Sequence, residues 1–213
     1  MRHIAFLIIF FTFLSIPFSS SAQSEYTIPG NTYANNGELE WYVYKDKVGE
    51  IKVSKKDVEI NSTKNNGMVA FTFAKAPIDF NGDFYLSATL KPDKVDDKHL
   101  FGFAFNVPNE NDYNAIMFDN QFCYYVRVVN GRIKGLRDRT LYKKGKSKDK
   151  KWRIAIERKN LGEFSVTLNG LEIRTFPSTT PFSFPAIGAC AINKNKVKIT
   201  EVSYTQWAAP TEQ

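Results

Sequence analysis

The chain has 213 residues, of which 43% are hydrophobic and 15% aromatic, and its formal net charge at pH 7 is +7. This length is typical of one folded domain that needs neither a metal ion nor a disulfide for stability.

Residues 1–22 predict a secretory signal peptide. A basic head, Met1 to His3, precedes an apolar run from Ile4 to Phe18, and small residues then lead to Ala22. The run is shorter than the roughly 20 apolar residues of a membrane-spanning helix, and no second run follows. We therefore expect cleavage after Ala22, no membrane span, and a secreted or periplasmic protein.

Alternation of apolar and polar side chains predicts strands along most of the remaining chain, because a period of two places neighbouring residues on opposite faces of a strand. The segment 23–52 is the least regular, with one strand predicted near Leu39 to Tyr44. Further strands are predicted at 57–62, 68–73, four times within 82–130, and at 132–136, 152–157, 164–168, 171–173, 186–192 and 197–204. Asn-Gly pairs such as Asn169-Gly170 favour hairpin turns between them.

About twelve strands without a sustained helical period indicate an all-β domain. We expect two stacked antiparallel sheets, each with a core face and an outer face. The predicted division is a signal peptide (1–22), an N-terminal extension (23–37), a β-sandwich (38–206) and a tail (207–213).

The order of these strands resembles the concanavalin A-like lectin/glucanase superfamily in its laminin G-like bacterial form. The resemblance is carried by the segments GDFYLSATL, LFGFAF, YNAIMF, YYVRV, WRIAIER, FSVTLNGLEI and AIGACA, and by a final VKITEVSY. It implies a jelly-roll sandwich over about residues 38–206, and the outline is also similar to that of 3-keto-disaccharide hydrolase-like proteins. Because this fold carries lectins, hydrolases and adhesion domains alike, function has to be argued from a site.

Two cysteines, Cys123 and Cys190, lie in apolar strand segments of a chain that we expect to be exported. An oxidising compartment permits a disulfide between them, but buried free thiols are also common in sheet cores. The sequence leaves both alternatives open.

Few residues are candidates for catalysis. His99 has no adjacent nucleophile, so we interpret it as a surface residue at a strand edge. The glucanases of this fold carry Glu-x-Asp-x-x-Glu on one strand, and this chain offers only the weak candidates Glu38 and Glu40. Glycoside hydrolysis needs two facing carboxyl groups, so a non-catalytic role is favoured.

We expect no cofactor, with calcium as a minor alternative. The segment Pro108–Asp112 contains the weak candidates Glu110 and Asp112, whose carboxylate oxygens are the hard ligands that calcium prefers. Their spacing is not that of an EF-hand, and such segments are usually turns.

A binding site is predicted from residues of the central strands. Tyr125 and Arg127 share one face of their strand, and Asn106, Tyr113 and Asn114 lie near the ends of neighbouring strands. An aromatic ring with amide and guanidinium donors suits a sugar. The alternative is that the tyrosines only cover the sheet.

A basic segment follows, with Lys143, Lys144, Lys146, Lys148, Lys150 and Lys151 in a predicted loop. Such a run is either a solvated loop or a contact for polyanions. The candidate partners are a glycan or acidic polysaccharide, lipopolysaccharide phosphate and an anionic surface. Nucleic acid is not expected, because no recognition motif is present.

Three hypotheses remain. The first is an exported carbohydrate-binding, lectin-like domain without catalytic activity. The second is a glycan-active hydrolase of the same fold, either 3-keto-disaccharide hydrolase-like or glucanase-like. The third is a structural or protein-binding domain of the cell envelope. The sequence does not determine the oligomeric state.

Overall fold

The computed structural model describes residues 32–35, 39–65, 67–109, 111–134, 139–142, 150–177 and 184–207. The predicted signal peptide (1–22), Glu38, Glu110 and four lysines of the basic segment (Lys143, Lys144, Lys146 and Lys148) lie outside the described residues. Within them the secondary structure consists of sixteen strands. No helix in these ranges has the length and apolar character needed to cross a membrane.

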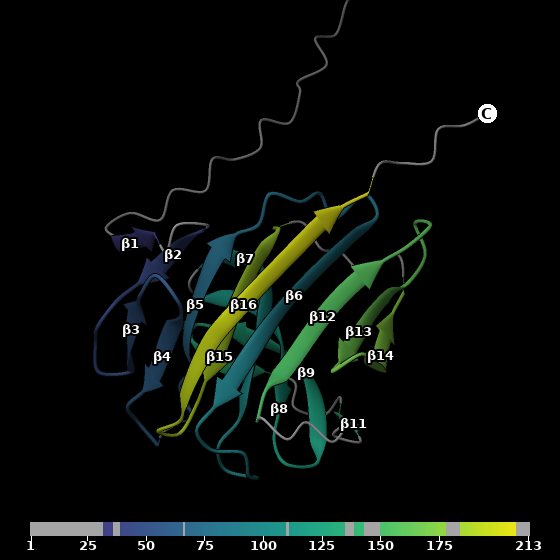
Figure 1. The fold of residues 1–213 in the computed structure, drawn as a ribbon. Helices are drawn as coiled ribbons and strands as arrows, with labels where there is room; N and C mark the ends of the chain where they lie inside the picture. Colours follow the sequence, from purple (N-terminus) through teal and green to yellow (C-terminus); the bar gives the residue numbers. More distant parts are fainter. Residues whose placement is uncertain are drawn as a thin grey trace, which may run out of the picture.

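The described strands form two antiparallel sheets that lie face to face as a sandwich (Figure 1). The nine-stranded sheet has the order β1 (Thr32–Asn35), β2 (Glu40–Val43), β5 (Ala70–Lys75), β15 (Ala186–Ala191), β7 (Phe101–Asn109), β8 (Asp112–Phe118), β9 (Phe122–Val129) and β10 (Arg132–Lys134), with β11 (Arg139–Leu141) also paired to β9. The seven-stranded sheet has the order β14 (Leu171–Phe176), β13 (Phe164–Leu168), β12 (Trp152–Arg158), β6 (Phe84–Pro92), β16 (Lys196–Gln206), β4 (Val58–Ser62) and β3 (Gly49–Val53). The predicted all-β sandwich is therefore confirmed.

The main core fills the space between the two sheets. Alternate residues of each strand point into it, as the period of two predicts. The seven-stranded sheet contributes residues such as Leu86 and Ile154, and the nine-stranded sheet contributes Phe101, Phe103 and Phe105, all completely buried. These apolar faces are the ones that the alternation in the sequence identifies.

The opposite face of the nine-stranded sheet, expected to be an outer face, is in large part buried. It carries a second buried cluster, which includes Phe71, Phe73, Tyr113 and Val128. The rings of Phe71 and Tyr113 stack at 4.3 Å between centroids, although β15 and β7 separate their strands. Three strand spacings in a flat sheet would place them about 14 Å apart, so the sheet must curl.

The curl brings the hairpin between β9 and β10 into contact with the segment that leads into β5. The backbone N–H of Val69 donates to the carbonyl of Gly131 at 3.2 Å, and Met68 forms a β-bridge with Arg132. Small residues make the curvature sterically possible. A Cβ atom on Gly188 would lie 2.2 Å from the Thr72 carbonyl oxygen, so β15 approaches β5 more closely than any other residue type would permit.

The two cysteines are buried and form no disulfide, the second of the two alternatives. Cys123 lies on β9 and contributes to the main core, whereas Cys190 lies on β15 and contributes to the second cluster. Two strands, β7 and β8, separate them, and they face opposite sides of the sheet. A disulfide needs Cα atoms within about 7 Å, which this placement does not allow.

Candidate functional site

The five residues predicted to bind a ligand line one pocket. This pocket, here called the β7–β9 pocket, has a volume of about 280 Å³, and its lining residues are Asn106, Pro108, Asp112, Tyr113, Asn114, Tyr125 and Arg127. They come from β7, β8 and β9, which are neighbours in the nine-stranded sheet.

Pairing between the strands aligns the polar members of the pocket. Asn114 on β8 lies in register between Phe105 on β7 and Arg127 on β9. Arg127 is in turn opposite Lys134 of β10. Asn114 is half-buried and Arg127 is exposed, so amide and guanidinium groups stand side by side at the mouth of the pocket.

A bulge in β7 shapes one wall. The register between β7 and β8 shifts after Phe105, and Asn106 adopts a positive φ of 49°, a conformation that asparagine tolerates better than most residues. The side-chain Oδ1 of Asn106 accepts a hydrogen bond from the backbone N–H of Phe184 at 3.0 Å. This bond fixes the wall to the segment that leads into β15.

Tyr125 supplies the aromatic surface. The centroid of its half-buried ring lies 4.8 Å from that of the Phe176 ring on β14. The guanidinium of Arg174 lies 5.7 Å from the centroid of the Tyr125 ring. The ring is therefore held between the two sheets at the edge of the main core. A rigid ring of this kind can pack against the apolar C–H face of a sugar at low entropic cost.

Asp112 adds an acceptor with spare capacity. Its Oδ2 accepts a hydrogen bond from Asn109 Nδ2 at 3.4 Å, while its Oδ1 is buried and has no hydrogen-bond partner among the described residues. A ligand hydroxyl could supply the missing donor. Within the described ranges, no group of three or more His, Cys, Asp or Glu side chains could hold a metal ion, and the other calcium candidate, Glu110, lies outside them.

Tyr113 has a different role from the one predicted. It is 2% exposed, and its ring points to the second cluster, where it stacks on Phe71. Burial raises the pKa of its hydroxyl well above the ordinary value. Tyr113 thus forms the packed floor beneath the pocket instead of a platform for sugar.

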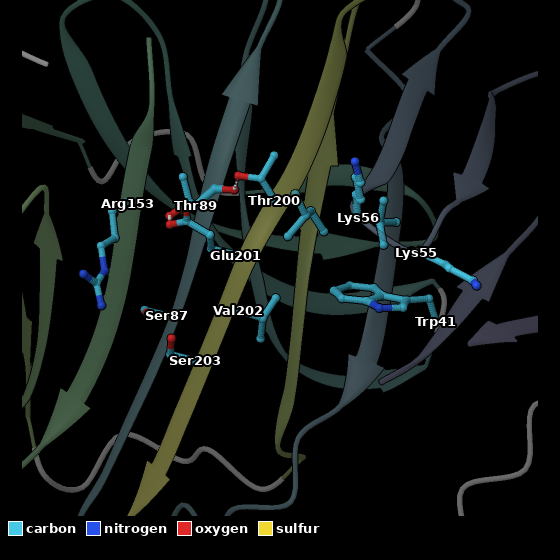
Figure 2. A pocket seen from close by; sticks show the side chains of 12 residues that line it. Trp41, Lys55, Lys56, Ser87, Thr89, Arg153, Thr200, Glu201, Val202 and Ser203 are labelled. Atoms are coloured by element: carbon cyan, nitrogen blue, oxygen red, sulfur yellow. Dashed lines mark hydrogen bonds between the residues drawn. The ribbon is translucent and has the colours of Figure 1, made fainter. Parts of the chain in front are cut away.

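A second pocket was not predicted from the sequence. It has a volume of about 350 Å³ and lies at the seven-stranded sheet (Figure 2). Its polar lining side chains are Lys55, Lys56, Ser87, Thr89, Arg153, Thr200, Glu201 and Ser203. We call it the β6–β16 groove. Its residues are scattered over five strands and one turn in the sequence, and only the pairing register brings them together.

Neither pocket contains a pair of carboxyl groups among its described lining residues. Asp112 is the acid of the β7–β9 pocket, and Glu201 is that of the β6–β16 groove. The weak catalytic candidate Glu40 lies on β2, is exposed and lines neither pocket. The described lining of neither pocket therefore provides the two carboxyl groups that a glycosidase of this type needs.

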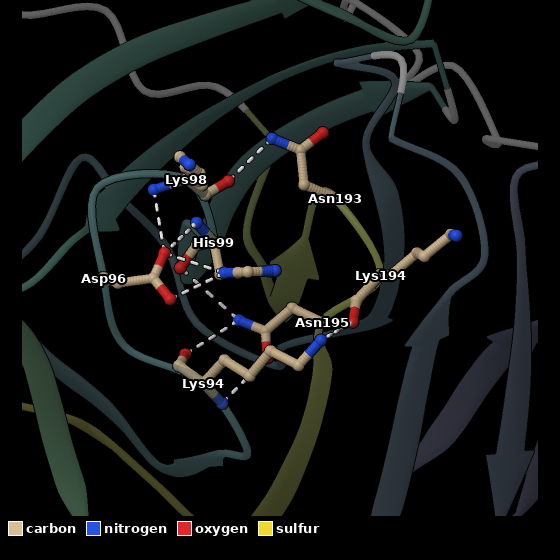
Figure 3. A network of polar contacts seen from close by, with 7 residues as sticks. All are labelled: Lys94, Asp96, Lys98, His99, Asn193, Lys194 and Asn195. Carbon is tan, nitrogen blue, oxygen red and sulfur yellow. Dashed lines mark hydrogen bonds and ion pairs between the residues drawn. The ribbon is translucent and has the colours of Figure 1, made fainter.

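His99 belongs to a hydrogen-bond network that holds a loop outside both pockets (Figure 3). Its Nδ1 lies 2.7 Å from each carboxylate oxygen of Asp96 and donates to that carboxylate. The buried Asn195 holds the same loop, because its Nδ2 donates to the carbonyl of Lys94 and its Oδ1 accepts from the Lys94 backbone N–H. His99 precedes β7, as predicted, and is half-buried rather than fully exposed.

Two lysines of the basic segment are described. Lys150 is exposed, and the Nζ of Lys151 lies 3.8 Å from Glu201 Oε1. The basic segment therefore ends beside the β6–β16 groove.

No protein-family model matches the sequence, and no curated protein matches it in sequence. Among solved structures, a Bacillus subtilis protein of unknown function with a galectin-like fold is similar, with a TM-score of 0.51 at 11% identity, over 78% of this chain and 89% of that one. A sialidase has a TM-score of 0.52 at 9% identity over 78% of this chain, which spans only 17% of the sialidase. The carbohydrate-binding module CBM66 from Bacillus subtilis gives 0.42 at 13% identity, over 82% of this chain and 91% of that one. At these identities the likeness concerns the fold alone.

Proposed function

We propose that this protein is an exported, non-catalytic carbohydrate-binding domain of concanavalin A-like jelly-roll type, which binds a glycan in the β7–β9 pocket. One observation carries the proposal. The residues that the sequence singles out as suited to a sugar (Asn106, Asn114, Tyr125 and Arg127) converge on a single pocket, although they come from three different strands.

The chemistry of the pocket supports a carbohydrate. The half-buried Tyr125 offers a flat ring, while Asn114, Arg127 and the unpaired Oδ1 of Asp112 offer donors and an acceptor for hydroxyl groups. Sugar recognition combines an aromatic surface with a few convergent polar groups. A single carboxylate favours binding without hydrolysis, since hydrolysis by this class needs two.

The test is a glycan array probed with the purified mature chain, followed by calorimetry on any glycan that binds. Arg127→Gln is expected to weaken binding about tenfold or more, because a charge-assisted hydrogen bond is lost. Arg132→Gln is the matched control, since it removes the same charge from an exposed residue outside the pocket. Equal losses in both variants, or binding to no glycan at all, would overturn the proposal.

Further measurements on the same purified protein separate the alternatives. Release of reducing sugar from a bound glycan, abolished by Glu40→Gln, would favour the hydrolase. Capture of an envelope protein without any glycan binding would favour the third hypothesis. Export itself is tested by expression of the full chain, whose exported product is expected to begin at Gln23.

A further inference from the structure

The β6–β16 groove has a floor of small hydroxyl side chains. Ser87 on β6 lies directly opposite Ser203 on β16, and Thr89 lies opposite Glu201 two residues further along, on the same face of the sheet. Ser87 and Thr89 are almost completely buried, whereas Ser203 and Glu201 are exposed. Figure 2 shows these side chains together on the sheet, with Arg153 of β12 beside them.

The groove lies where β4 has not yet begun, because the first residue of β4, Val58, pairs with Ile199 of β16. β4 pairs only with Lys196–Ile199 of β16, and β16 then bulges at Thr200 and continues along β6 to Gln206. Beyond this point no described strand pairs with β16 on the β4 side. The turn before β4, with Lys55 and Lys56, forms the far rim, and the buried ring of Trp41 lies at the inner end.

The charges around this hollow are mainly positive. Lys55, Lys56 and Arg153 line it, and neither Lys55 nor Lys56 has an ion-pair partner among the described residues. The one acid, Glu201, is already engaged by the Thr89 hydroxyl at 3.0 Å and by Lys151 at 3.8 Å. Lys55 and Lys56 therefore remain for a ligand, together with the donors of Arg153 that its hydrogen bond to the Tyr85 hydroxyl at 3.2 Å leaves over.

We propose that the β6–β16 groove is a second binding site, which takes an acidic polysaccharide. Hydroxyl groups of the floor suit the hydroxyls of a sugar chain, while Arg153, Lys55 and Lys56 suit its repeated carboxylate or sulfate groups. The spread of the cations from β12 to the β3–β4 turn fits an extended chain better than a single small anion. This site shares no lining residue with the β7–β9 pocket, so it does not depend on the function proposed above.

The basic segment ends next to the groove. Lys151 both ends that segment and contacts Glu201 in the groove. Clustered cations attract a polyanion within the Debye length of about 8 Å at physiological salt, and this attraction does not depend on the shape of the surface. Only a shaped site makes binding sensitive to a single uncharged side chain. This difference provides the test.

Binding is measured by calorimetry at about 0.15 M salt with polygalacturonate as the carboxylate probe, heparin as the sulfate probe and dextran as the neutral probe. Lys55→Gln/Lys56→Gln and Arg153→Gln are each expected to weaken binding of an acidic probe about fivefold or more. Lys64→Gln/Lys75→Gln is the matched control, because both lysines are exposed and lie outside the groove. It is expected to change binding less than about twofold.

A variant that fills the groove without a change of charge distinguishes binding in the groove from a diffuse attraction between charges. Ser203→Leu leaves the charge unchanged but occupies the groove, and it is expected to weaken binding as much as the charge variants do. Thr175→Leu, on an exposed position of β14, is its control. Thermal unfolding of each variant checks that it is folded.

Four results would overturn the proposal. The first is binding to none of the acidic probes. The second is an equal loss in the Lys64/Lys75 control. The third is a folded Ser203→Leu variant with undiminished binding. The fourth is equal retention of single-stranded DNA and the polysaccharides with the same dependence on Lys55 and Lys56, which would indicate a general attraction of polyanions. Preference for polygalacturonate or for heparin assigns carboxylate or sulfate as the recognised group.

Discussion

Asp96 organises its loop as an acceptor for several donors. Its Oδ1 accepts hydrogen bonds from the backbone N–H groups of Lys98 at 2.8 Å and His99 at 3.0 Å, and the His99 ring adds a third donor. The Lys98 N–H, followed by the His99 ring, holds the pKa of Asp96 below its ordinary value. The residue pattern Asp-x-x-His was visible in the sequence, but nothing there showed that both groups fold onto one turn.

This shift predicts a pH dependence. Since the pKa of Asp96 is lower in the folded state, its contribution to stability is complete above the unfolded value near 4 and is lost as the pH falls through the folded value. Asp96→Asn should therefore lower the thermal midpoint at about pH 6, and the difference from the parent should shrink at about pH 3. Asp97→Asn is the control at a neighbouring exposed residue. A constant difference at both pH values would contradict the assignment.

The residues of the β7–β9 pocket show how far the sequence predicts the position of single side chains. Tyr125 and Arg127 were placed on one strand face by alternation alone, and both reach the pocket. Tyr113 satisfied the same chemical criterion, but its ring belongs to the second cluster. A sequence gives residue types and strand faces, whereas the direction in which a sheet curls decides which face is wet.

At the scale of elements, β15 packs very closely against β5 in the nine-stranded sheet. All six of its residues are buried, and Gly188 lies against the backbone of β5. The run Ala-Ile-Gly-Ala-Cys-Ala was predicted as a strand, and its small residues now have a reason, since they allow the sheet to curl around the second cluster.

Gly188→Ala should be strongly destabilising. The added Cβ would meet the Thr72 carbonyl oxygen at 2.2 Å and the Phe73 Cα at 3.0 Å, so β5 and β15 would have to separate. The expected loss is about 3 kcal/mol or more in urea unfolding. Gly131→Ala is the comparison, because it has open space around it but a φ of +67°, and it should cost only about 1–2 kcal/mol. Similar losses for the two variants would show that steric contact is not the cause.

Two short strands were missed near the N-terminal end. β3 does alternate, with Ile51 and Val53 against Glu50 and Lys52, so its signal was present in the sequence. β1 is four residues long, and Asn35 and Ala34 give no β-forming pattern. Pairing with β2 makes this segment a strand, although its composition does not favour one. The place on β16 where β4 begins to pair, which leaves the groove open, likewise depends on register and could not be predicted.

At the scale of the whole molecule, the two sheets enclose one core and the curled sheet encloses another. The strand β5 is buried on both faces, from Ala70 to Ala74. Sequence reasoning predicted a sandwich and the apolar faces correctly. It could not predict the second core, because a mixed aromatic and small-residue face fits an exposed surface as well as a concave buried one.

The second core should contribute to stability as much as the first. Phe71→Leu and Phe103→Leu, one in each core, are each expected to cost about 1–2 kcal/mol in urea unfolding, because both leave a gap in packed surroundings. Phe184→Leu, at a ring that is 38% exposed, should cost less than about 0.5 kcal/mol. If Phe71→Leu behaved like Phe184→Leu, the cluster would be only a surface patch.

The contact between the β9–β10 hairpin and Met68 has a consequence for association between copies of the chain. A sheet that ends in an open row of N–H and C=O groups offers a template on which another chain can add a strand and begin an aggregate. Here β10 is only three residues long, and its first residue is already bridged to the segment that leads into β5. The curl that buries the second core thus also leaves this border of the sheet with little to offer an incoming strand.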